Sequence, residues 1–158
     1  MYARDHALIA TPIGLIRIDG DSQVSAIRIG ADGQPQRGST PAVRAAADQI
    51  ERWFAGELQQ FDLDLEPSAT ARGQELRDGL IAVGYGDTLS YGALARLLGS
   101  APRAIGQLCA RNPFPIVVPC HRIVGAGGAL GNYSGGEGPK TKAWLLDHER
   151  RHSGELLL

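Results

Sequence analysis

Apolar and polar residues alternate along the first part of the chain in the way that β-strands require. Residues 7–18 predict two strands around a Pro12-Ile13-Gly14 break, and Val24 to Ile29 predicts a third strand. Apolar residues then recur at three- and four-residue spacing between Pro41 and Gly56, which predicts a helix. Strict alternation over residues 61–66 favours one more half-buried strand.

The periodicity of residues 69–158 is mostly helical. Helices are expected over about 71–83, over 91–98 with Ser90 as the N-cap, from Pro102 to about Ala110, and over 140–151. Pro67-Ser68 separates this region from the strands. We therefore expect an α+β protein with an N-terminal α/β domain (1–68) and a mostly helical C-terminal domain (69–158). Many packed helix pairs share the spacing of the two short helices around Gly99, so their likeness to a helix-turn-helix stays open.

One apolar segment ends in a residue pair that can carry chemistry. Residues 112–119 lead into Cys120 and His121 through Pro119, and proline stiffens the backbone there. A thiol beside an imidazole is typical of nucleophilic catalysis. The same pattern also fits a structural cysteine at the end of a core strand, and the segment alone leaves both readings open. A glycine-rich stretch follows up to Gly136, which suggests that a ligand approaches the backbone closely.

Composition and cysteine use narrow the class of protein. The chain has 158 residues, 43% of them hydrophobic, and lacks an apolar run long enough for a signal peptide or a membrane span. Its two cysteines, Cys109 and Cys120, fall in different predicted elements, so we expect reduced thiols in a cytoplasmic protein. The histidines show no zinc-site spacing. We expect no metal and no cofactor.

Charge is distributed unevenly although the net charge is only −1. Residues 1–68 carry a net −4, and residues 69–158 carry a net +3. From Thr88 to Gly136 there is no acidic residue, whereas four arginines are present. A surface without carboxylates suits a phosphate backbone, which acidic side chains would repel.

The predicted helix that begins at Pro102 has two different faces. Its apolar face contains Ile105, Leu108 and Cys109, and Cys109 is expected to be a core residue. The opposite face carries small or sparsely polar residues: Arg103, Gly106, Gln107 and Ala110. Such a face suits close approach to a nucleic-acid backbone or minor groove. Tight packing against another helix explains Gly106 and Ala110 equally well.

Taken together, these motifs make the chain resemble the O6-alkylguanine-DNA alkyltransferases, also called methylated-DNA–protein-cysteine methyltransferases. The resemblance spans about residues 83–150. It is carried by six motifs in the family's order: Ser90-Tyr91 with Leu94-Ala95, Arg103-Ala104-Ile105-Gly106, Asn112-Pro113, Pro119-Cys120-His121-Arg122-Ile123-Val124, Gly131-Asn132-Tyr133-Ser134-Gly135-Gly136, and Trp144-Leu145-Leu146-Asp147-His148-Glu149. For the N-terminal domain the resemblance implies a ribonuclease-H-like fold, and for the C-terminal domain a helix-turn-helix-like DNA-binding motif.

The resemblance implies a chemical role for four residues. Cys120 is expected to take the alkyl group from O6 of guanine irreversibly, in a single turnover. His121 is expected to act on Cys120 as a base through a water, and Glu149 to orient and charge the imidazole. Asn112 is expected to brace the turn before the active-site strand. O4-alkylthymine is left open as a second substrate.

The resemblance also implies how double-stranded DNA is handled. The target nucleotide is flipped into a pocket, and Arg103 enters the stack in its place. Tyr91 pushes on the target phosphate and contacts the base, while Tyr133 and Ser134 donate near O6. Ile123 and Gly135 are expected to line the pocket. Further DNA contacts are expected from Ala104, Gly106 and, on charge grounds alone, Arg111. We expect a monomer that associates with the nucleoid when it is bound to DNA.

Three stretches depart from the family pattern. Residues 71–83 have Arg72, Leu76 and Arg77 where relatives have Phe and Val-Trp. The turn before Arg103 is about two residues shorter than in some relatives, and the segment 137–139 contains two extra residues. These departures bear on local packing and on which alkyl groups fit.

Two other functions stay open at this point. An alkyltransferase-like protein would flip and flag alkylguanine without repairing it, but such relatives lack the acceptor cysteine that Cys120 provides. A hydrolytic cysteine enzyme would use Cys120 and His121 over many turnovers, although nothing in the chain resembles an amidase or protease pocket.

Overall fold

The computed structural model describes residues 4–153. Its internal contacts divide the chain into two compact units, residues 1–66 and residues 67–158. This division falls two residues before the one expected from Pro67-Ser68. No helix among the described residues is both long enough and apolar enough to cross a membrane.

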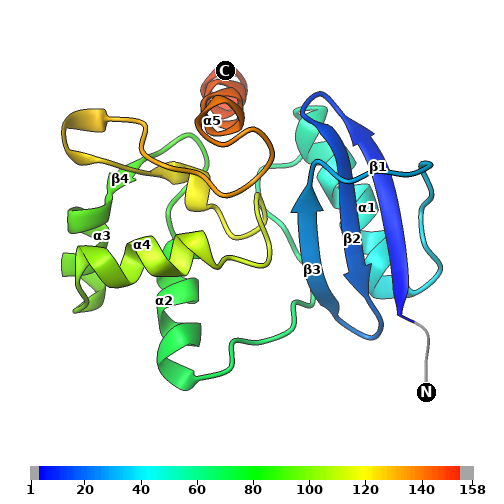
Figure 1. Cartoon of the computed structure of the whole chain (residues 1–158), viewed down its shortest axis with the longest axis horizontal. Helices are drawn as coiled ribbons and strands as arrows, with labels where there is room; N and C mark the ends of the chain where they lie inside the picture. Colours follow the sequence, from blue (N-terminus) through cyan, green and yellow to red (C-terminus); the bar gives the residue numbers. More distant parts are fainter. Residues whose placement is uncertain (1–3, 154–158) are drawn as a thin grey trace. The chain divides into compact units, whose positions relative to one another are not determined.

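The N-terminal unit is a three-stranded antiparallel sheet with one helix against it (Figure 1). The strands are β1 (Asp5–Thr11), β2 (Gly14–Gly20) and β3 (Val24–Ile29), and the helix is α1 (Pro41–Phe54). Val43, Ala46, Ala47, Ile50 and Trp53 are the buried residues of α1, as the helical spacing predicts. The three predicted strands and the helix are therefore confirmed.

The further strand expected over residues 61–66 is not formed. Leu65 makes only an isolated bridge to Val24, through hydrogen bonds at the neighbouring residues. The side chain of Gln49 instead bonds both backbone groups of Asp62, at 2.9 Å each. Because a side chain satisfies these groups, the segment needs no strand partner there.

The C-terminal unit is mostly helical. Its elements are α2 (Ala71–Ile81), β4 (Leu89–Ser90), α3 (Tyr91–Leu98), α4 (Pro102–Ala110), η1 (Cys120–Arg122), β5 (Ile123–Val124), η2 (Ala126–Gly128) and α5 (Pro139–Ser153). Ser90 caps α3 by accepting from Ala93 N, and Gly99 ends α3 in a left-handed conformation with φ 63°. The four predicted helices are confirmed within a few residues of their expected ends.

A short parallel pairing brings two distant motifs together. Leu89 pairs with Ile123 and Ser90 pairs with Val124, which makes β4 and β5 neighbours. Tyr91 follows β4 directly, and Cys120 lies three residues before β5. The pairing therefore places the start of α3 beside the segment that carries the cysteine.

Residues 112–119 form a loop that is buried from Phe114 onward, and not a core strand that ends at the cysteine. The apolar side chains of residues 114–118 are buried, and Ile116 has a positive φ of 75°. A β-branched residue adopts this conformation only when its surroundings fix it, at a cost of about 1–3 kcal/mol. Asn112 supports the loop, because its Oδ1 accepts from Phe114 N and its Nδ2 donates to Val118 O, both at 2.9 Å.

The two arginines that depart from the family pattern both have structural contacts. Arg72 donates from Nη2 to the backbone oxygens of Leu98 (2.8 Å) and Gly99 (3.1 Å), so it binds the C-terminal end of α3. Arg77 is buried, and its guanidinium lies 5.1 Å from the centre of the Phe114 ring. Cation–π packing therefore links α2 to the loop that precedes Cys120.

Candidate active site

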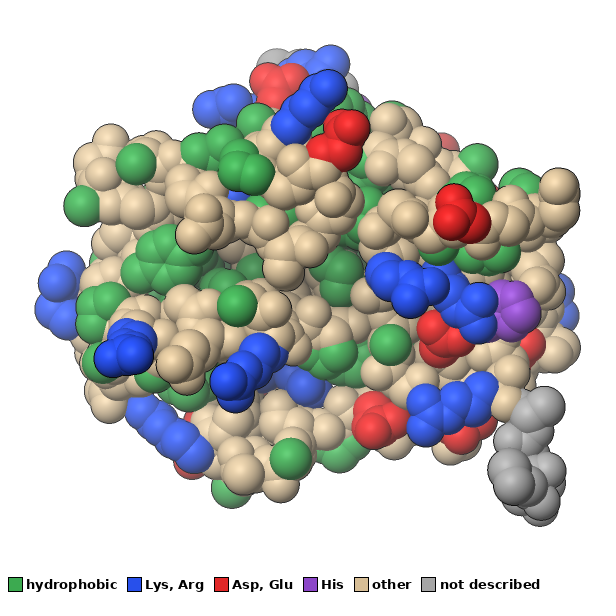
Figure 2. All heavy atoms as spheres, in the orientation of Figure 1, with side chains coloured by type: hydrophobic (Ala, Val, Ile, Leu, Met, Phe, Trp, Pro, Cys, Tyr) green, Lys and Arg blue, Asp and Glu red, His purple; other side chains and the backbone are tan. Residues whose placement is uncertain are grey.

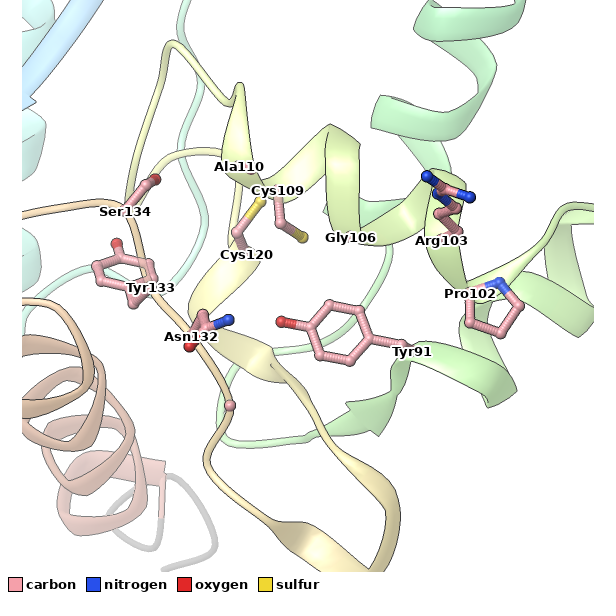
Figure 3. A pocket seen from close by; sticks show the side chains of 11 residues that line it. Tyr91, Pro102, Arg103, Gly106, Cys109, Ala110, Cys120, Asn132, Tyr133 and Ser134 are labelled. Carbon is pink, nitrogen blue, oxygen red and sulfur yellow. The ribbon is translucent and has the colours of Figure 1, made fainter.

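The surface of the C-terminal unit is hollowed beside α3 and α4. Figure 2 shows hydrophobic side chains in this hollow and Lys and Arg side chains around it. The pocket has a volume of about 580 Å³. Its lining comes from α3, α4, η1 and the loop before α5: Tyr91, Pro102, Arg103, Gly106, Cys109, Ala110, Cys120, Gly131, Asn132, Tyr133 and Ser134 (Figure 3).

Cys120 is a buried residue in the lining of this pocket. The residue is only 3% exposed, and its Sγ accepts a hydrogen bond of 3.3 Å from Asn112 Nδ2. The same amide nitrogen bonds Val118 O. Asn112 therefore holds both the loop and the sulfur, and it keeps the thiol directed at the pocket.

His121 and Arg122, which follow Cys120 in the sequence, form a buried ionic group with Glu149. His121 Nε2 lies 2.7 Å from Glu149 Oε2, and neither side chain is exposed. Arg122 donates to Glu149 from Nε at 3.0 Å and from Nη2 at 2.8 Å. Glu149 also accepts from Gly86 N at 3.0 Å. The glutamate thus joins α5, η1 and the loop before β4.

The protonation of this group follows from its surroundings. Burial would raise the pKa of Glu149, but hydrogen bonds and charges from His121 and Arg122 lower it to about 2. Burial lowers the pKa of His121, against the effect of Glu149 and with the help of the Arg122 charge. The imidazole is therefore neutral near pH 7. When Nε2–H donates to Glu149, the basic nitrogen is Nδ1.

Two tyrosines and a serine supply hydroxyl groups to the pocket. Tyr91 comes from α3, while Tyr133 and Ser134 come from the loop before α5 (Figure 3). Burial raises the pKa of Tyr91 and of Tyr133, and negative charge on the two cysteines acts in the same direction. Both phenols therefore stay protonated at neutral pH and can donate hydrogen bonds.

Four other residues singled out from the sequence are not among those lining the pocket. Ile123 is fully buried, Gly135 follows the lining loop, Ala104 lies in the first turn of α4, and Arg111 is the exposed C-cap of α4. Ile123 contributes through its carbonyl, which accepts from Lys142 Nζ at 2.6 Å.

Arg103 and Gly106 lie on the rim of the pocket. Arg103 is exposed in the first turn of α4, and Gly106 follows one turn later. A Cβ atom added at Gly106 would meet nothing within 4 Å. Tight packing against another helix therefore does not explain this glycine. The space above it is open to a ligand.

Lys142 is a functional candidate that the sequence did not indicate. It is fully buried, and its Nζ donates to Ile123 O at 2.6 Å and to Asn132 O at 3.2 Å. It also lies 5.7 Å from the centre of the Tyr91 ring. Its charge lowers the pKa of the thiols of Cys109 and Cys120. Only its place at the start of the last helix could have suggested this role.

The structure places Cys109 differently from the sequence-based expectation. It was expected in the core, but it is half-buried and lines the pocket next to Cys120 (Figure 3). The reason is that the side of α4 with Gly106, Cys109 and Ala110 faces the pocket, and Ile105 is the one fully buried residue of the helix.

Among residues 4–153 no group of three or more His, Cys, Asp or Glu side chains could hold a metal ion.

Comparisons with known proteins agree on one family. The family model described as "6-O-methylguanine DNA methyltransferase, DNA binding domain" matches residues 73–151. A methylated-DNA–protein-cysteine methyltransferase of Mycolicibacterium paratuberculosis is 38% identical over 157 residues, which covers 94% of each protein. The constitutive enzyme of Bacillus subtilis is 41% identical over 113 residues, or 70% of this chain and 68% of that one. The crystal structure of Mycobacterium tuberculosis OGT in complex with DNA has a TM-score of 0.80 at 35% identity and covers 93% of both chains.

Proposed function

The chain belongs to the methylated-DNA–protein-cysteine methyltransferase family, and we propose that it repairs O6-alkylguanine in DNA by taking the alkyl group onto its own Cys120. One observation carries this proposal. Cys120 lines the pocket, and His121, the next residue in the chain, is buried and paired with Glu149 at 2.7 Å. Each protein molecule reacts once, since the alkyl group stays on the sulfur as a thioether, from which a thiolate is a poor leaving group.

The reaction is a displacement at the alkyl carbon. The Cys120 thiolate forms the C–S bond, the bond from that carbon to O6 breaks, and its electron pair stays on the guanine. Phenols and a hydroxyl that remain protonated in the pocket can donate to the guanine as charge develops. Tyr91, Tyr133 and Ser134 are the groups available for this step.

Activation of the thiol needs help from its neighbours. The hydrogen bond with Cys109 and burial raise the pKa of Cys120, while Asn112 and the Lys142 charge act against them. A neutral His121 can take the thiol proton through a water. Glu149 stabilises the imidazolium that results. Arg122 keeps the glutamate ionised without making the histidine permanently charged.

Double-stranded DNA reaches this pocket only if the damaged nucleotide leaves the stack. Arg103 on the rim is suited to occupy the vacated space, and Gly106 leaves room for the DNA backbone. Arg111 and Ala104 extend this surface, which carries no carboxylate between Thr88 and Gly136. We assign α3 and α4 to a helix-turn-helix-like motif, and residues 67–158 to the DNA-binding and alkyl-acceptor domain.

The N-terminal unit fits the ribonuclease-H-like domain implied by the family resemblance. This assignment is supported by the antiparallel strand order β1–β2–β3 and by α1, which packs against the sheet.

We further propose that the protein is a monomer and that it is cytoplasmic, at the nucleoid when it is bound to DNA. Gel filtration with light scattering, with and without duplex DNA, tests the oligomeric state.

Intact mass after incubation with a duplex containing O6-methylguanine tests the proposed reaction. The expected result is a gain of one methyl group per molecule, which Cys120→Ala abolishes. Binding of the duplex without a gain in mass would favour a sensor. Continued turnover beyond one equivalent would favour a hydrolytic enzyme, and either outcome overturns the proposal.

A further inference from the structure

The pocket contains both cysteines of the chain. Cys120 comes from η1 and Cys109 from the last turn of α4, and their side chains lie next to each other in the lining of the pocket (Figure 3). The two thiols are close enough that each shifts the pKa of the other. The alkyl transfer described above uses one of these sulfurs and assigns no chemistry to the other.

The surroundings of the pair favour one negative charge shared between two sulfurs. Contact with Cys120 lowers the pKa of Cys109, whereas contact with Cys109 and burial raise the pKa of Cys120, and the charge of Lys142 acts to lower both. Asn112 Nδ2 donates to Cys120 Sγ at 3.3 Å. The pocket is open to small solutes, and a thiolate with a second thiol in contact is the arrangement found in redox-active cysteine pairs.

We propose that Cys109 and Cys120 form a reversible disulfide when a hydroperoxide enters the pocket. In the first step Cys120 gives its proton to His121, as in alkyl transfer, and its sulfur attacks a peroxide oxygen. The O–O bond breaks, and a sulfenic acid forms together with hydroxide, which takes the proton back from His121 and leaves as water. In the second step the Cys109 sulfur attacks that sulfur, the S–O bond breaks, and a second water leaves. Two thiols and one hydrogen peroxide thus give one disulfide and two waters.

The disulfide protects a sulfur that the protein cannot replace. A sulfenic acid that meets more peroxide becomes a sulfinic acid, which thiols do not reduce. Well-oriented intramolecular reactions reach effective concentrations on the order of 10⁵ M. Capture by Cys109 therefore outpaces a second encounter with dilute peroxide. The disulfide blocks alkyl transfer until a dithiol reduces it, and the acceptor then becomes available again.

The inference rests on the proposed function for its consequence, but the disulfide itself can be observed without any DNA. Hydrogen peroxide is added in stoichiometric steps to the reduced full-length protein, followed by a thiol-blocking reagent. Trypsin separates the cysteines into the peptides 104–111 and 112–122, because Arg103, Arg111 and Arg122 bound them. The expected product is a cross-link between these two peptides, with the loss of two hydrogen atoms.

Cys109→Ser is the matched variant, since it keeps a small polar side chain and removes the second sulfur. Each protein is compared with its own unoxidised sample in the methyl-transfer assay. Wild-type capacity is expected to return almost fully with dithiothreitol. In the variant, the peptide 112–122 is expected to gain oxygen atoms, and capacity is expected to stay lost.

Added oxygen in the wild type instead of the cross-link would overturn the inference, as would equal recovery of the variant or a cross-link between two protein molecules. If Cys109→Ser does not fold, the presence or absence of the cross-link in the wild type tests the inference without the variant. Failure of the reduced protein to accept a methyl group would overturn the proposed function and leave the disulfide as a separate result.

Discussion

His121 Nε2 and Glu149 Oε2 lie 2.7 Å apart with neither side chain exposed to solvent. Such a pair has two effects that can be separated by experiment. It fixes the imidazole that serves the cysteine, and it buries a carboxylate that must be compensated by charge. Arg122 supplies that compensation through two nitrogens.

Glu149→Gln is expected to slow methyl transfer by about a hundredfold. The amide oxygen can still accept from His121, but it cannot stabilise the imidazolium, and it leaves the Arg122 charge uncompensated. Single-turnover rates with an O6-methylguanine duplex measure the effect. Asp147→Asn is the matched control, because it removes one carboxylate from the exposed face of the same helix, where Asp147 bonds Arg151 at 3.0 Å. Equal rates for wild type and Glu149→Gln would remove the glutamate from the reaction.

Acid is expected to destabilise the C-terminal unit in two steps. The folded pKa of His121 lies below its ordinary 6.5, so the unfolded chain binds the proton more readily and stability falls as the pH drops below 6.5. The folded pKa of Glu149 is about 2 against an ordinary 4.5, so its contribution is present above 4.5 and is lost as the pH falls toward 2. Denaturant midpoints between pH 7 and pH 3 measure both steps. Between pH 4.5 and pH 3 the denaturant midpoint should fall less in Glu149→Gln than in wild type. An equal fall in both proteins would exclude the contribution of Glu149.

Arg103→Ala is expected to slow repair of duplex DNA by about tenfold to a hundredfold, because the space left by the flipped nucleotide is then unfilled. Reaction with a free O6-benzylguanine base requires no flipping and should keep its rate within about twofold. The ratio of the two rates is the measurement. Arg44→Ala on α1 removes an exposed arginine from the other unit and serves as the control. Equal losses on duplex and free base would reject the proposed role of Arg103.

Lys142→Met is expected to shift the pH profile of alkyl transfer upward. Without the buried ammonium the pKa of Cys120 rises, so that a higher pH is needed for the same amount of thiolate. The carbonyls of Ile123 and Asn132 also lose a charged donor, which costs about 1.5–3 kcal/mol for each bond. Rates with the free base from pH 6 to pH 9 test the shift. Lys140→Met is the control, since Lys140 is exposed on the same helix and pairs only loosely with Glu137, at 3.7 Å. A matching profile in both variants would contradict the electrostatic role.

The sequence predicted the elements whose cause is local. Ser90 and Gly99 set the ends of α3 through their own side-chain and backbone preferences, and the spacing of apolar residues fixed the helices. The Cys120-His121 pair and Glu149 were recognised because each belongs to one of the motifs that carry the family resemblance. Their contact, in contrast, depends on the packing of α5 against η1.

Features that depend on tertiary packing escaped prediction. The β-branched residues 116–118 favour a strand, but burial and the Asn112 hydrogen bonds bend them into a loop. The pairing of β4 with β5 involves only two residues of each, too few to leave a pattern. Cys109 was expected in the core because helical spacing does not show which side of α4 faces an empty pocket.

The amide of Asn112 donates to both Val118 O and Cys120 Sγ, so one sulfur atom belongs to the hydrogen-bond network that shapes its own loop. An alkyl group on that sulfur occupies space beside the amide and weakens the bond to it. Reacted and unreacted molecules therefore differ in local stability although they differ in covalent structure at a single atom. We expect reacted molecules to open more often around residues 112–119, and general proteases can then remove them selectively without any dedicated tag.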